Sequence, residues 1–385
     1  MGIHVLDAMA REGFEEVVAL HDARSGLRGF LGIHESRIGP AFGGIRRWSY
    51  RDEDHALLDC LRLARAMTHK CALAGLPAGG AKLVVLDRVD LDRTAAYRRI
   101  GEVVEGLGGR FYTGPDVGTT EDDLSIVAEE TRFVTRPGAE GPGELSNATS
   151  EGVVAGIAAA LRHLDGEEDW PRRTIVVQGL GGIGRGVATR LLDRGARVIA
   201  AEIDPERADQ LARDLDLEIV DPASELDQPC DVFAPCALGG ILHDLSIARL
   251  RCRIVAGGAN NVLARSGHGD QLHERGILYA PDIVITAGAL IRGALFHLEG
   301  RREPVAAIGD RIGSVLSAIL ERAREERRPT SRVARDEADE RLDRVRSTRE
   351  PARGQATGGS GAGRSRPRPS SGPAGKSSPA PDDVV

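Results

Sequence analysis

The chain has 385 residues, 41% of them hydrophobic and 28% charged, and this balance is typical of a globular protein of two domains rather than one. Its formal charge of −7 argues against nucleic acid as a partner, because phosphate binding needs a basic surface. No apolar run reaches the roughly 18 residues of a membrane span, and residues 1–10 lack the basic-then-apolar order of a signal peptide, so we expect no membrane partner.

The first part of the chain predicts an α/β arrangement. Apolar residues at helical spacing predict helices over 56–68 and 92–107. Between these helices, a loop rich in Gly, Ala and Pro is predicted over 74–81, followed by a short strand over 83–86. A strand end with a turn is predicted over 111–118.

Residues 135–147 are rich in Gly and predict a linker to a second α/β block. In this block strands alternate with helices, which is the pattern of a parallel sheet covered on both faces. A helix over 150–164 opens the block, and a later helix ends at Arg194. The predicted strands are 174–178, 197–201, 232–234, 253–256 and 277–279.

The C-terminal part is predicted to be helical and then disordered. Beyond Ala287 an Arg- and Glu-rich helical region runs to about Arg346, and we expect it to pack back on the first block. Residues 348–385 contain no aromatic residue, and half of them are Gly, Pro or Ser. Such a segment cannot bury enough apolar surface to offset the entropy lost on ordering, so we predict a disordered tail.

A glycine cluster follows the predicted strand 174–178 and opens the next helix. Its sequence is G-x-G-x-x-G, and the positions expected to approach a dinucleotide are Gly179, Gly181, Gly182, Ile183 and Gly184. The glycines allow a tight turn, and the helix N-terminus offers N–H groups and partial positive charge to a pyrophosphate. The strand–turn–helix context therefore predicts a Rossmann unit.

An acidic residue, Glu202, ends the next strand and lies 18 positions after Gly184. Its carboxylate would accept hydrogen bonds from the adenine ribose hydroxyls and repel a 2′-phosphate, which favours NAD over NADP as the cofactor. Asp204 is an alternative for the ribose role, and Arg207 slightly weakens the preference for NAD.

The chain has only three lysines, Lys70, Lys82 and Lys376, among 51 basic residues. Arginine cannot lose its proton near neutral pH, whereas a desolvated lysine can. Lys376 lies in the low-complexity tail. Lys70 and Lys82 are therefore candidates for amine chemistry, and the alternative for both is a solvated surface charge.

The sequence around these lysines reads IGPAFGGIRRW (38–48), LRLARAMTHKCALAGLPAGGAKLVV (61–85) and TGPDVGTTEDDL (113–124). Together with the Rossmann block, with DVFAPCALGGIL (231–242) and with AGGANNVL (256–263), these motifs resemble the Glu/Leu/Phe/Val amino-acid dehydrogenase superfamily. The resemblance covers about residues 30 to 340 and is greatest for the leucine dehydrogenase branch.

The resemblance implies a role for each matching position. Lys70 matches the lysine that binds the substrate carboxylate, and Lys82 and Asp116 match the catalytic lysine and aspartate. The remaining matches are Gly43 and Gly44 beside the substrate, Phe42, Gly114, Leu290 and Gly293 around its side chain, and Thr149 and Asn261 near the nicotinamide. A homo-oligomer, either a dimer or an octamer, is also implied.

The residue types suit the implied reaction. Oxidation at Cα requires a neutral amine before the hydride leaves, and water must then add to the iminium. A lysine near another cation and away from bulk water has a lowered pKa and can act as a base. We expect Lys70 to be that second cation for Lys82, and Asp116 to exchange protons with the substrate amine. Alone, Asp116 could equally be a turn residue before Gly118.

Two positions depart from the family pattern, because Thr286 replaces an amide and Ala289 replaces a glycine. Two more depart from the leucine dehydrogenase branch, where Arg292 replaces a small polar residue and Gly293 an aliphatic one. An apolar pocket excludes a γ-carboxylate, so we expect an apolar, branched-chain L-amino acid as substrate. A phenylalanine- or tryptophan-type enzyme and an NAD-binding paralogue without turnover are the alternatives. An inward-pointing Arg292 would admit an acidic substrate.

No metal site is expected. Cys230 and Cys236 have no second pair beside them, and His268 and His273 lack the one-turn spacing of a helical metal pair. The five cysteines are few and scattered, which favours reduced thiols and a cytoplasmic protein.

The expected fold class is α/β with two domains. Residues 1–147, completed by helices over 288–346, form the predicted substrate and catalytic domain, and residues 148–287 form the predicted Rossmann NAD-binding domain, followed by the tail over 348–385.

Overall fold

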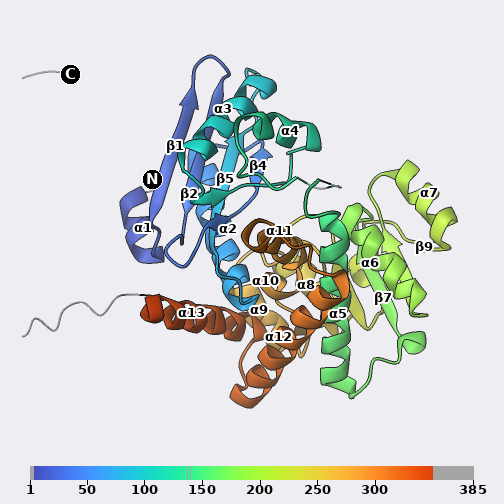
Figure 1. Ribbon diagram of the computed structural model, residues 1–385. Coiled ribbons are helices and arrows are strands. Elements are labelled where there is room, and N and C mark those ends of the chain that lie inside the picture. The colour runs from blue at the N-terminus through green and yellow to red at the C-terminus, as the bar shows by residue number, and fades with distance from the viewer. Residues whose placement is uncertain (1–3, 137, 139, 350–385) are drawn as a thin grey trace, which may run out of the picture. The chain divides into compact units, whose positions relative to one another are not determined.

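The structure is a computed structural model that describes residues 4–136, 138 and 140–349. These residues form two six-stranded sheets with helices around them, which is the two-domain α/β fold class that the sequence predicts (Figure 1). The predicted tail lies outside the described residues except for Thr348 and Arg349, which end the last helix. In the described ranges, no helix is long and apolar enough to cross a membrane.

The first sheet is mixed and contains strands that the sequence did not predict. Its order is β1-β2-β5-β3-β6, with β4 beside β5; β1 and β5 are antiparallel to β2, and the other pairs are parallel. The strands are β1 (Glu16–Asp22), β2 (Leu27–Ile33), β3 (Ala41–Phe42), β4 (Ile45–Trp48), β5 (Gly79–Leu86) and β6 (Phe111–Tyr112). The helices are α1 (Val5–Glu12), α2 (Glu53–Leu73), α3 (Arg93–Gly106) and α4 (Glu121–Glu130).

Strand β5 is longer than predicted and is buried along its whole length. The predicted loop over 74–81 is wrong at its end, because Gly79 and Gly80 already belong to this strand and pair with β3. A Cβ atom at Gly80 would lie 2.1 Å from the amide nitrogen of Thr68, so α2 crosses the strand closely there. Helix α2 also extends past the predicted end to Leu73, which places Lys70 in its last turn.

The second sheet is parallel throughout and runs in the order β12-β11-β10-β7-β8-β9. If the six strands are numbered 1 to 6 along the chain, the order read from β9 to β12 is 3-2-1-4-5-6, which is the arrangement of a Rossmann domain. The strand order reverses between β7 and β10. The strands are β7 (Thr174–Gln178), β8 (Arg197–Ala201), β9 (Glu218–Ile219), β10 (Val232–Pro235), β11 (Ile254–Val255) and β12 (Leu278–Tyr279). The helices around it are α6 (Gly182–Asp193), α7 (Pro205–Leu215), α8 (Asp244–Arg249), α9 (Gly267–Glu274) and α10 (Asp282–Ile285), with short 3₁₀ turns at Trp170–Arg172 and Glu225–Asp227.

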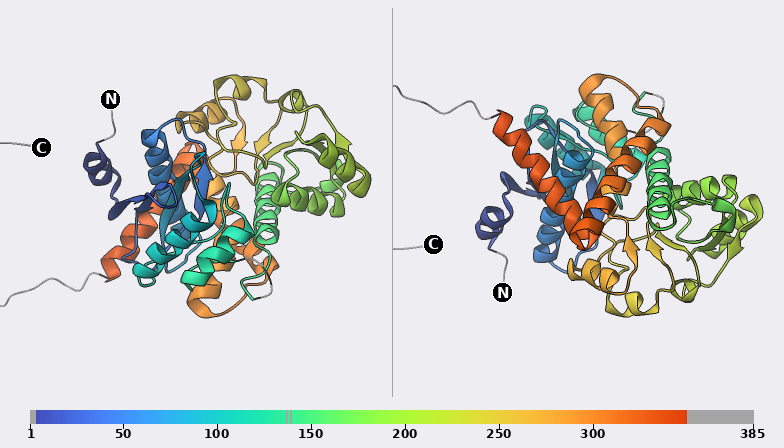
Figure 2. Two further views of the ribbon diagram at one scale, coloured as in Figure 1. Left: turned by 90° about the horizontal axis from the view of Figure 1, so that it is seen from above. Right: turned by 90° about the horizontal axis from the view of Figure 1, so that it is seen from below.

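Helix α5 (Leu145–Asp165) connects the two sheets along the chain, and Figure 2 shows the blue strands of the first sheet apart from the green and yellow strands of the second. The predicted linker over 135–147 is therefore too long, because its last three residues form the first turn of α5. One core cluster includes Phe42 and Cys71 from the first part as well as Ile157 of α5 and Val177 of the second sheet. The predicted division at residues 147 and 148 stays a prediction.

The C-terminal region forms three helices, α11 (Gly288–Glu299), α12 (Val305–Glu326) and α13 (Thr330–Arg349). Helix α13 packs against α2, as expected for a segment that returns to the first block. Helix α12 packs chiefly on α5 and not on the first block, because α5 presents small residues to it. A Cβ atom at Gly152 would lie 2.5 Å from Cδ1 of Ile312 and 2.8 Å from the carbonyl oxygen of Ile285.

We expect Gly152→Ala to destabilise the fold by about 1–3 kcal/mol, because the added methyl group meets a backbone carbonyl that cannot rotate away. The matched control is Gly106→Ala at the exposed end of α3, where an added Cβ atom has nothing within 4 Å. This control should be neutral or should stabilise by up to about 1 kcal/mol. Thermal unfolding followed by circular dichroism measures both, and equal melting temperatures for the two variants would contradict the close α5–α12 contact.

Candidate active site

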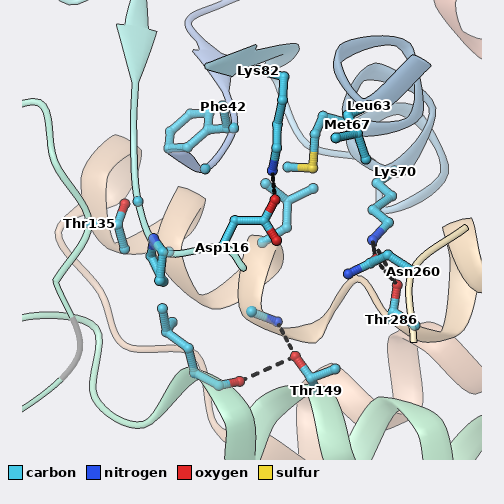
Figure 3. A pocket seen from close by; sticks show the side chains of 18 of the residues that line it. Phe42, Leu63, Met67, Lys70, Lys82, Asp116, Thr135, Thr149, Asn260 and Thr286 are labelled. Carbon is cyan, nitrogen blue, oxygen red and sulfur yellow. Dashed lines mark hydrogen bonds and ion pairs between the residues drawn. The ribbon is translucent and has the colours of Figure 1, made fainter. Parts of the chain in front are cut away.

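A cavity of about 350 Å³ brings together residues from both parts of the described chain (Figure 3). Every residue predicted for catalysis or substrate binding lines it, whereas only three of the predicted cofactor residues do. The predicted residues in its lining are Phe42, Gly43, Gly44, Lys70, Lys82, Gly114, Asp116, Leu290 and Gly293, together with Thr149, Ile183 and Asn261.

Lys82 lies on the buried central strand β5 and forms an ion pair with Asp116. Alternate residues of this strand, such as Leu83, pack under α3 and α4, so Lys82 faces the other side, toward α2. The lysine is 5% exposed, and burial lowers its pKa more than the carboxylate of Asp116 raises it. Burial by itself would raise the pKa of Asp116, but Lys82 and Arg46 outweigh it and hold the pKa at about 2.

The cation next to this pair is Arg46 and not, as expected, Lys70. The Nε atom of Arg46 lies 3.0 Å from Oδ2 of Asp116, and its Nη1 atom lies 3.0 Å from Oδ2 of Asp59. Arg46 contributes to the lowered pKa of Lys82, after burial. The sequence analysis missed Arg46, although it lies inside the motif IGPAFGGIRRW. Backbone hydrogen bonds from Ile45 to Gly114 (2.9 Å) and from Arg47 to Val117 (3.0 Å) bring it to Asp116.

Lys70 is 6% exposed, and burial lowers its pKa to about 8 although Asp282 opposes the shift. Its Nζ atom donates to Oδ1 of Asn260 and, over 2.7 Å, to Oγ1 of Thr286 (Figure 3). Thr286 is one of the departures from the family pattern, and here its hydroxyl holds the lysine in place. Asn260 was also missed, because nothing in the sequence relates it to Lys70.

Gly43 and Gly44 allow two backbone segments to approach the cavity. A Cβ atom at Gly43 would lie 1.8 Å from the carbonyl oxygen of Ala81, and one at Gly44 would lie 2.9 Å from Cβ of Asp116. Neither position tolerates a side chain, so these glycines fix Lys82 and Asp116 at their short separation.

The glycine turn lies outside the cavity lining except for Ile183. Gly179 has φ +83°, and a Cβ atom at Gly184 would lie 1.8 Å from the Gly179 carbonyl oxygen, so both positions require glycine. A Cβ atom at Gly181 would have nothing within 4 Å, which leaves open space above the N-terminus of α6. This open, donor-rich helix end fits a pyrophosphate.

Glu202 is 7% exposed and supports the turn directly. Its carboxylate accepts hydrogen bonds from the backbone N–H groups of Leu180 (2.8 Å) and Asp204 (3.0 Å). Asp204, the alternative for the ribose role, caps helix α7 and pairs with Arg207. Both carboxylates therefore already have hydrogen-bond partners, and Glu202 is the one that lies against the glycine turn.

Two further departures are accommodated without filling the cavity. The N–H group of Ala289 donates to Oγ1 of Thr149 (3.1 Å). Arg292 turns away and donates to the carbonyl oxygen of Pro142, so it does not line the cavity. In the ranges that the structure describes, no group of three or more His, Cys, Asp or Glu side chains could hold a metal ion.

Comparison with known proteins gives two family matches. A model described as "Glu/Leu/Phe/Val dehydrogenase, dimerisation domain" matches residues 15–133, and one described as "Glutamate/Leucine/Phenylalanine/Valine dehydrogenase" matches residues 202–299. A leucine dehydrogenase from Thermoactinomyces intermedius is 39% identical over 90% of this chain and 95% of its own length. A phenylalanine dehydrogenase from the same organism is 37% identical over 90% and 96%.

Among solved structures, the L-tryptophan dehydrogenase from Nostoc punctiforme superposes with a TM-score of 0.76 at 34% identity. The match covers 89% of this chain and 99% of that one.

The three lysines allow a direct test of the site's electrostatics. In protein labelled with ¹³C-lysine, assigned through Lys→Arg variants, we expect the Lys70 Cε signal to titrate near pH 8 because burial disfavours its charge. The Lys82 signal should titrate below the ordinary lysine value of about 10.5. Titration of all three signals above about pH 10 would show that neither amine is desolvated.

Proposed function

The chain belongs to the Glu/Leu/Phe/Val dehydrogenase family, and on this premise we propose that it catalyses the reversible NAD-dependent oxidative deamination of an apolar L-amino acid to its 2-oxo acid and ammonia. Amino-acid dehydrogenase activity with a nicotinamide cofactor follows from membership. The preference for NAD, the substrate and the residue roles are proposals. The observation that carries the proposed reaction is the buried Lys82–Asp116 ion pair, which lies in one cavity with Lys70.

We propose that Lys70 binds the substrate carboxylate, with the backbone at Gly43 and Gly44 beside it. The ammonium of Lys70 is already held by Asn260 and Thr286, so it needs little reorganisation to meet a carboxylate. Although burial lowers its pKa to about 8, Lys70 is still mostly protonated at neutral pH. A bound carboxylate would raise this pKa and so favour the ammonium form.

Lys82 and Asp116 are the proposed acid–base pair. The carboxylate of Asp116 takes a proton from the substrate ammonium, which leaves a neutral amine and allows the Cα–H bond to break as hydride departs. Bound NAD would supply the hydride acceptor. As water adds to the resulting iminium carbon, neutral Lys82 accepts the proton that the water loses. Asp116 then returns its proton to the amino group of the carbinolamine. As the C–N bond breaks to release ammonia, the carbinolamine hydroxyl gives its proton to the carboxylate of Asp116, which leaves the 2-oxo acid.

The proposed cofactor residues are the glycine turn, Glu202, Thr149 and Asn261. The buried carboxylate of Glu202 would repel a 2′-phosphate, which supports NAD. Arg207 is poorly placed to bind a 2′-phosphate, because its guanidinium group pairs with Asp204 over 3.0 Å and lies 3.5 Å from Glu202. We also propose that residues 1–147 with 288–346 act as the substrate domain, and residues 148–287 as the NAD domain.

Two further proposals concern assembly and location. The match to a dimerisation domain supports a homo-oligomer, a dimer or an octamer. The five cysteines are unpaired in the described part of the chain, which suits the reducing cytoplasm.

An aromatic substrate is the second candidate. Leu290 and Phe42 line the cavity, Gly114 and Gly293 add no side chain to it, and the ring of Phe42 stacks on Tyr112 at 5.0 Å. A paralogue without turnover is less well supported, because Thr286 and Ala289 keep hydrogen bonds to Lys70 and Thr149. With Arg292 turned away, no observation favours an acidic substrate.

A screen of the twenty L-amino acids with NAD and with NADP tests the proposed function. We expect reduction of NAD, and little of NADP, with apolar amino acids. In Lys82→Ala, turnover should fall about 10²–10⁴-fold because the base is lost, while NADH binding measured by fluorescence stays nearly unchanged. Binding of NADH without turnover of any amino acid would favour the inactive paralogue, and equal loss of turnover and binding in Lys82→Ala would contradict the proposed base.

Arg46 is a positioning residue whose charge should be visible in the pH profile. In Arg46→Gln the positive charge that repels protonated Lys82 is lost, and the carboxylate of Asp116 then has Lys82 as its only cationic partner among the described residues. Both effects raise the pKa of Lys82. We therefore expect the acidic limb of kcat/KM to shift upward by about one pH unit. Arg46→Lys, which keeps the charge, should restore the limb. An unchanged limb in Arg46→Gln would mean that Arg46 is merely structural.

A further inference from the structure

The side of the cavity beyond Asp116, away from Lys70, ends on Thr135 (Figure 3). Two glycines expose this residue. A Cβ atom at Gly114 would lie 3.3 Å from Cβ of Thr135, and one at Gly293 would lie 3.2 Å from its Cγ2. From both positions the Thr135 hydroxyl is 3.8 Å away. Because neither glycine carries a side chain, nothing at these positions screens the hydroxyl from a ligand.

His297 holds that hydroxyl from behind. Its Nε2 atom lies 2.9 Å from Oγ1 of Thr135, and its ring lies 4.8 Å from the ring of Tyr112 and 6.3 Å from that of Phe42. Burial lowers the pKa of His297, so the imidazole is neutral at neutral pH. A neutral imidazole and a hydroxyl offer hydrogen bonds without charge, and this chemistry does not suit a carboxylate side chain.

A second hydroxyl at this end has its hydrogen-bonding capacity unused. Thr113 is 1% exposed and lines the cavity, and its Oγ1 has no partner in the part of the chain that the structure describes. It lies beside Thr135, whose N–H group donates to the Thr113 carbonyl oxygen over 2.7 Å. A buried hydroxyl without a partner is unfavourable, so its presence at a ligand cavity points to a group that the ligand supplies.

We propose that Thr135, positioned by His297, and Thr113 form a polar end to the side-chain pocket that selects aromatic amino acids with a polar ring atom, namely an indole N–H or a phenol O–H. The inference rests on the proposed function and names its substrate class. The stacked rings of Phe42 and Tyr112 form an aromatic wall against which such a ring can lie. A branched aliphatic side chain would leave the Thr113 hydroxyl unpaired and the Thr135 hydroxyl bonded to His297 alone, so this inference replaces the branched-chain expectation.

The test is kcat/KM for L-tryptophan, L-tyrosine, L-phenylalanine and L-leucine. We expect tryptophan or tyrosine to exceed phenylalanine and leucine by at least about tenfold, since a site built around polar groups discriminates against analogues that cannot pair with them. In Thr135→Val this advantage over phenylalanine should vanish, because valine keeps the shape of threonine but lacks the hydroxyl that pairs with the ring.

His297→Leu should reduce the advantage in the same way, and His297→Gln, which can still bond to Thr135, should restore it. The matched control is Thr189→Val on α6, where the threonine hydroxyl donates only to the carbonyl of Arg185 in its own helix. Melting temperatures identify any variant that fails to fold, and Thr135→Val, which preserves shape, then carries the test.

If leucine is the best substrate, or if Thr135→Val changes all four substrates by one factor, the polar end plays no part in selection and the inference is wrong while the proposed function stands. If the wild-type protein oxidises no amino acid with either cofactor, the proposed function itself is overturned, and this inference with it.

Discussion

A buried carboxylate held between two cations, Asp116 between Lys82 and Arg46, is the interaction on which the rest of the site depends. A buried charge on Lys82 or on Asp116 would be unfavourable without the other, because burial disfavours the charged form of each group. Their mutual attraction keeps the carboxylate ionised, while burial keeps the amine easier to deprotonate than a surface lysine. The pair is therefore poised to exchange protons, which a salt bridge on the surface would not be.

Close backbone packing makes this arrangement possible. Gly43, Gly44 and Gly80 each lie where a Cβ atom would collide with a neighbouring backbone or side-chain atom, so a strand, a loop and helix α2 meet within a short distance. Side chains carried by these segments then converge on one space. The glycine turn at Gly179–Gly184 does the same for the second sheet, at the point where its strand order reverses.

The positions that depart from the family pattern show how a site tolerates change. Thr286 accepts a hydrogen bond from Lys70, so a hydroxyl contacts the lysine at the position where the family pattern has an amide. Arg292 turns to the carbonyl of Pro142, so its charge leaves the cavity. In each case the outcome depends on where the side chain finds a partner, and the residue type alone does not reveal this.

The sequence by itself determined the α/β class, the strands 174–178 and 197–201, the glycine turn and twelve of the residues that line the cavity, because these are written in local periodicity and in contiguous motifs. It did not determine the mixed first sheet, whose two-residue strands carry no periodic signal, or the start of β5 at Gly79, where a glycine pair is as typical of a loop. The tertiary structure decided that Arg46 and not Lys70 is the cation beside Asp116, that Thr286 and Asn260 hold Lys70, and that His297 stands behind Thr135. These contacts join residues from 70 to 216 positions apart, and only the tertiary fold brings such residues together.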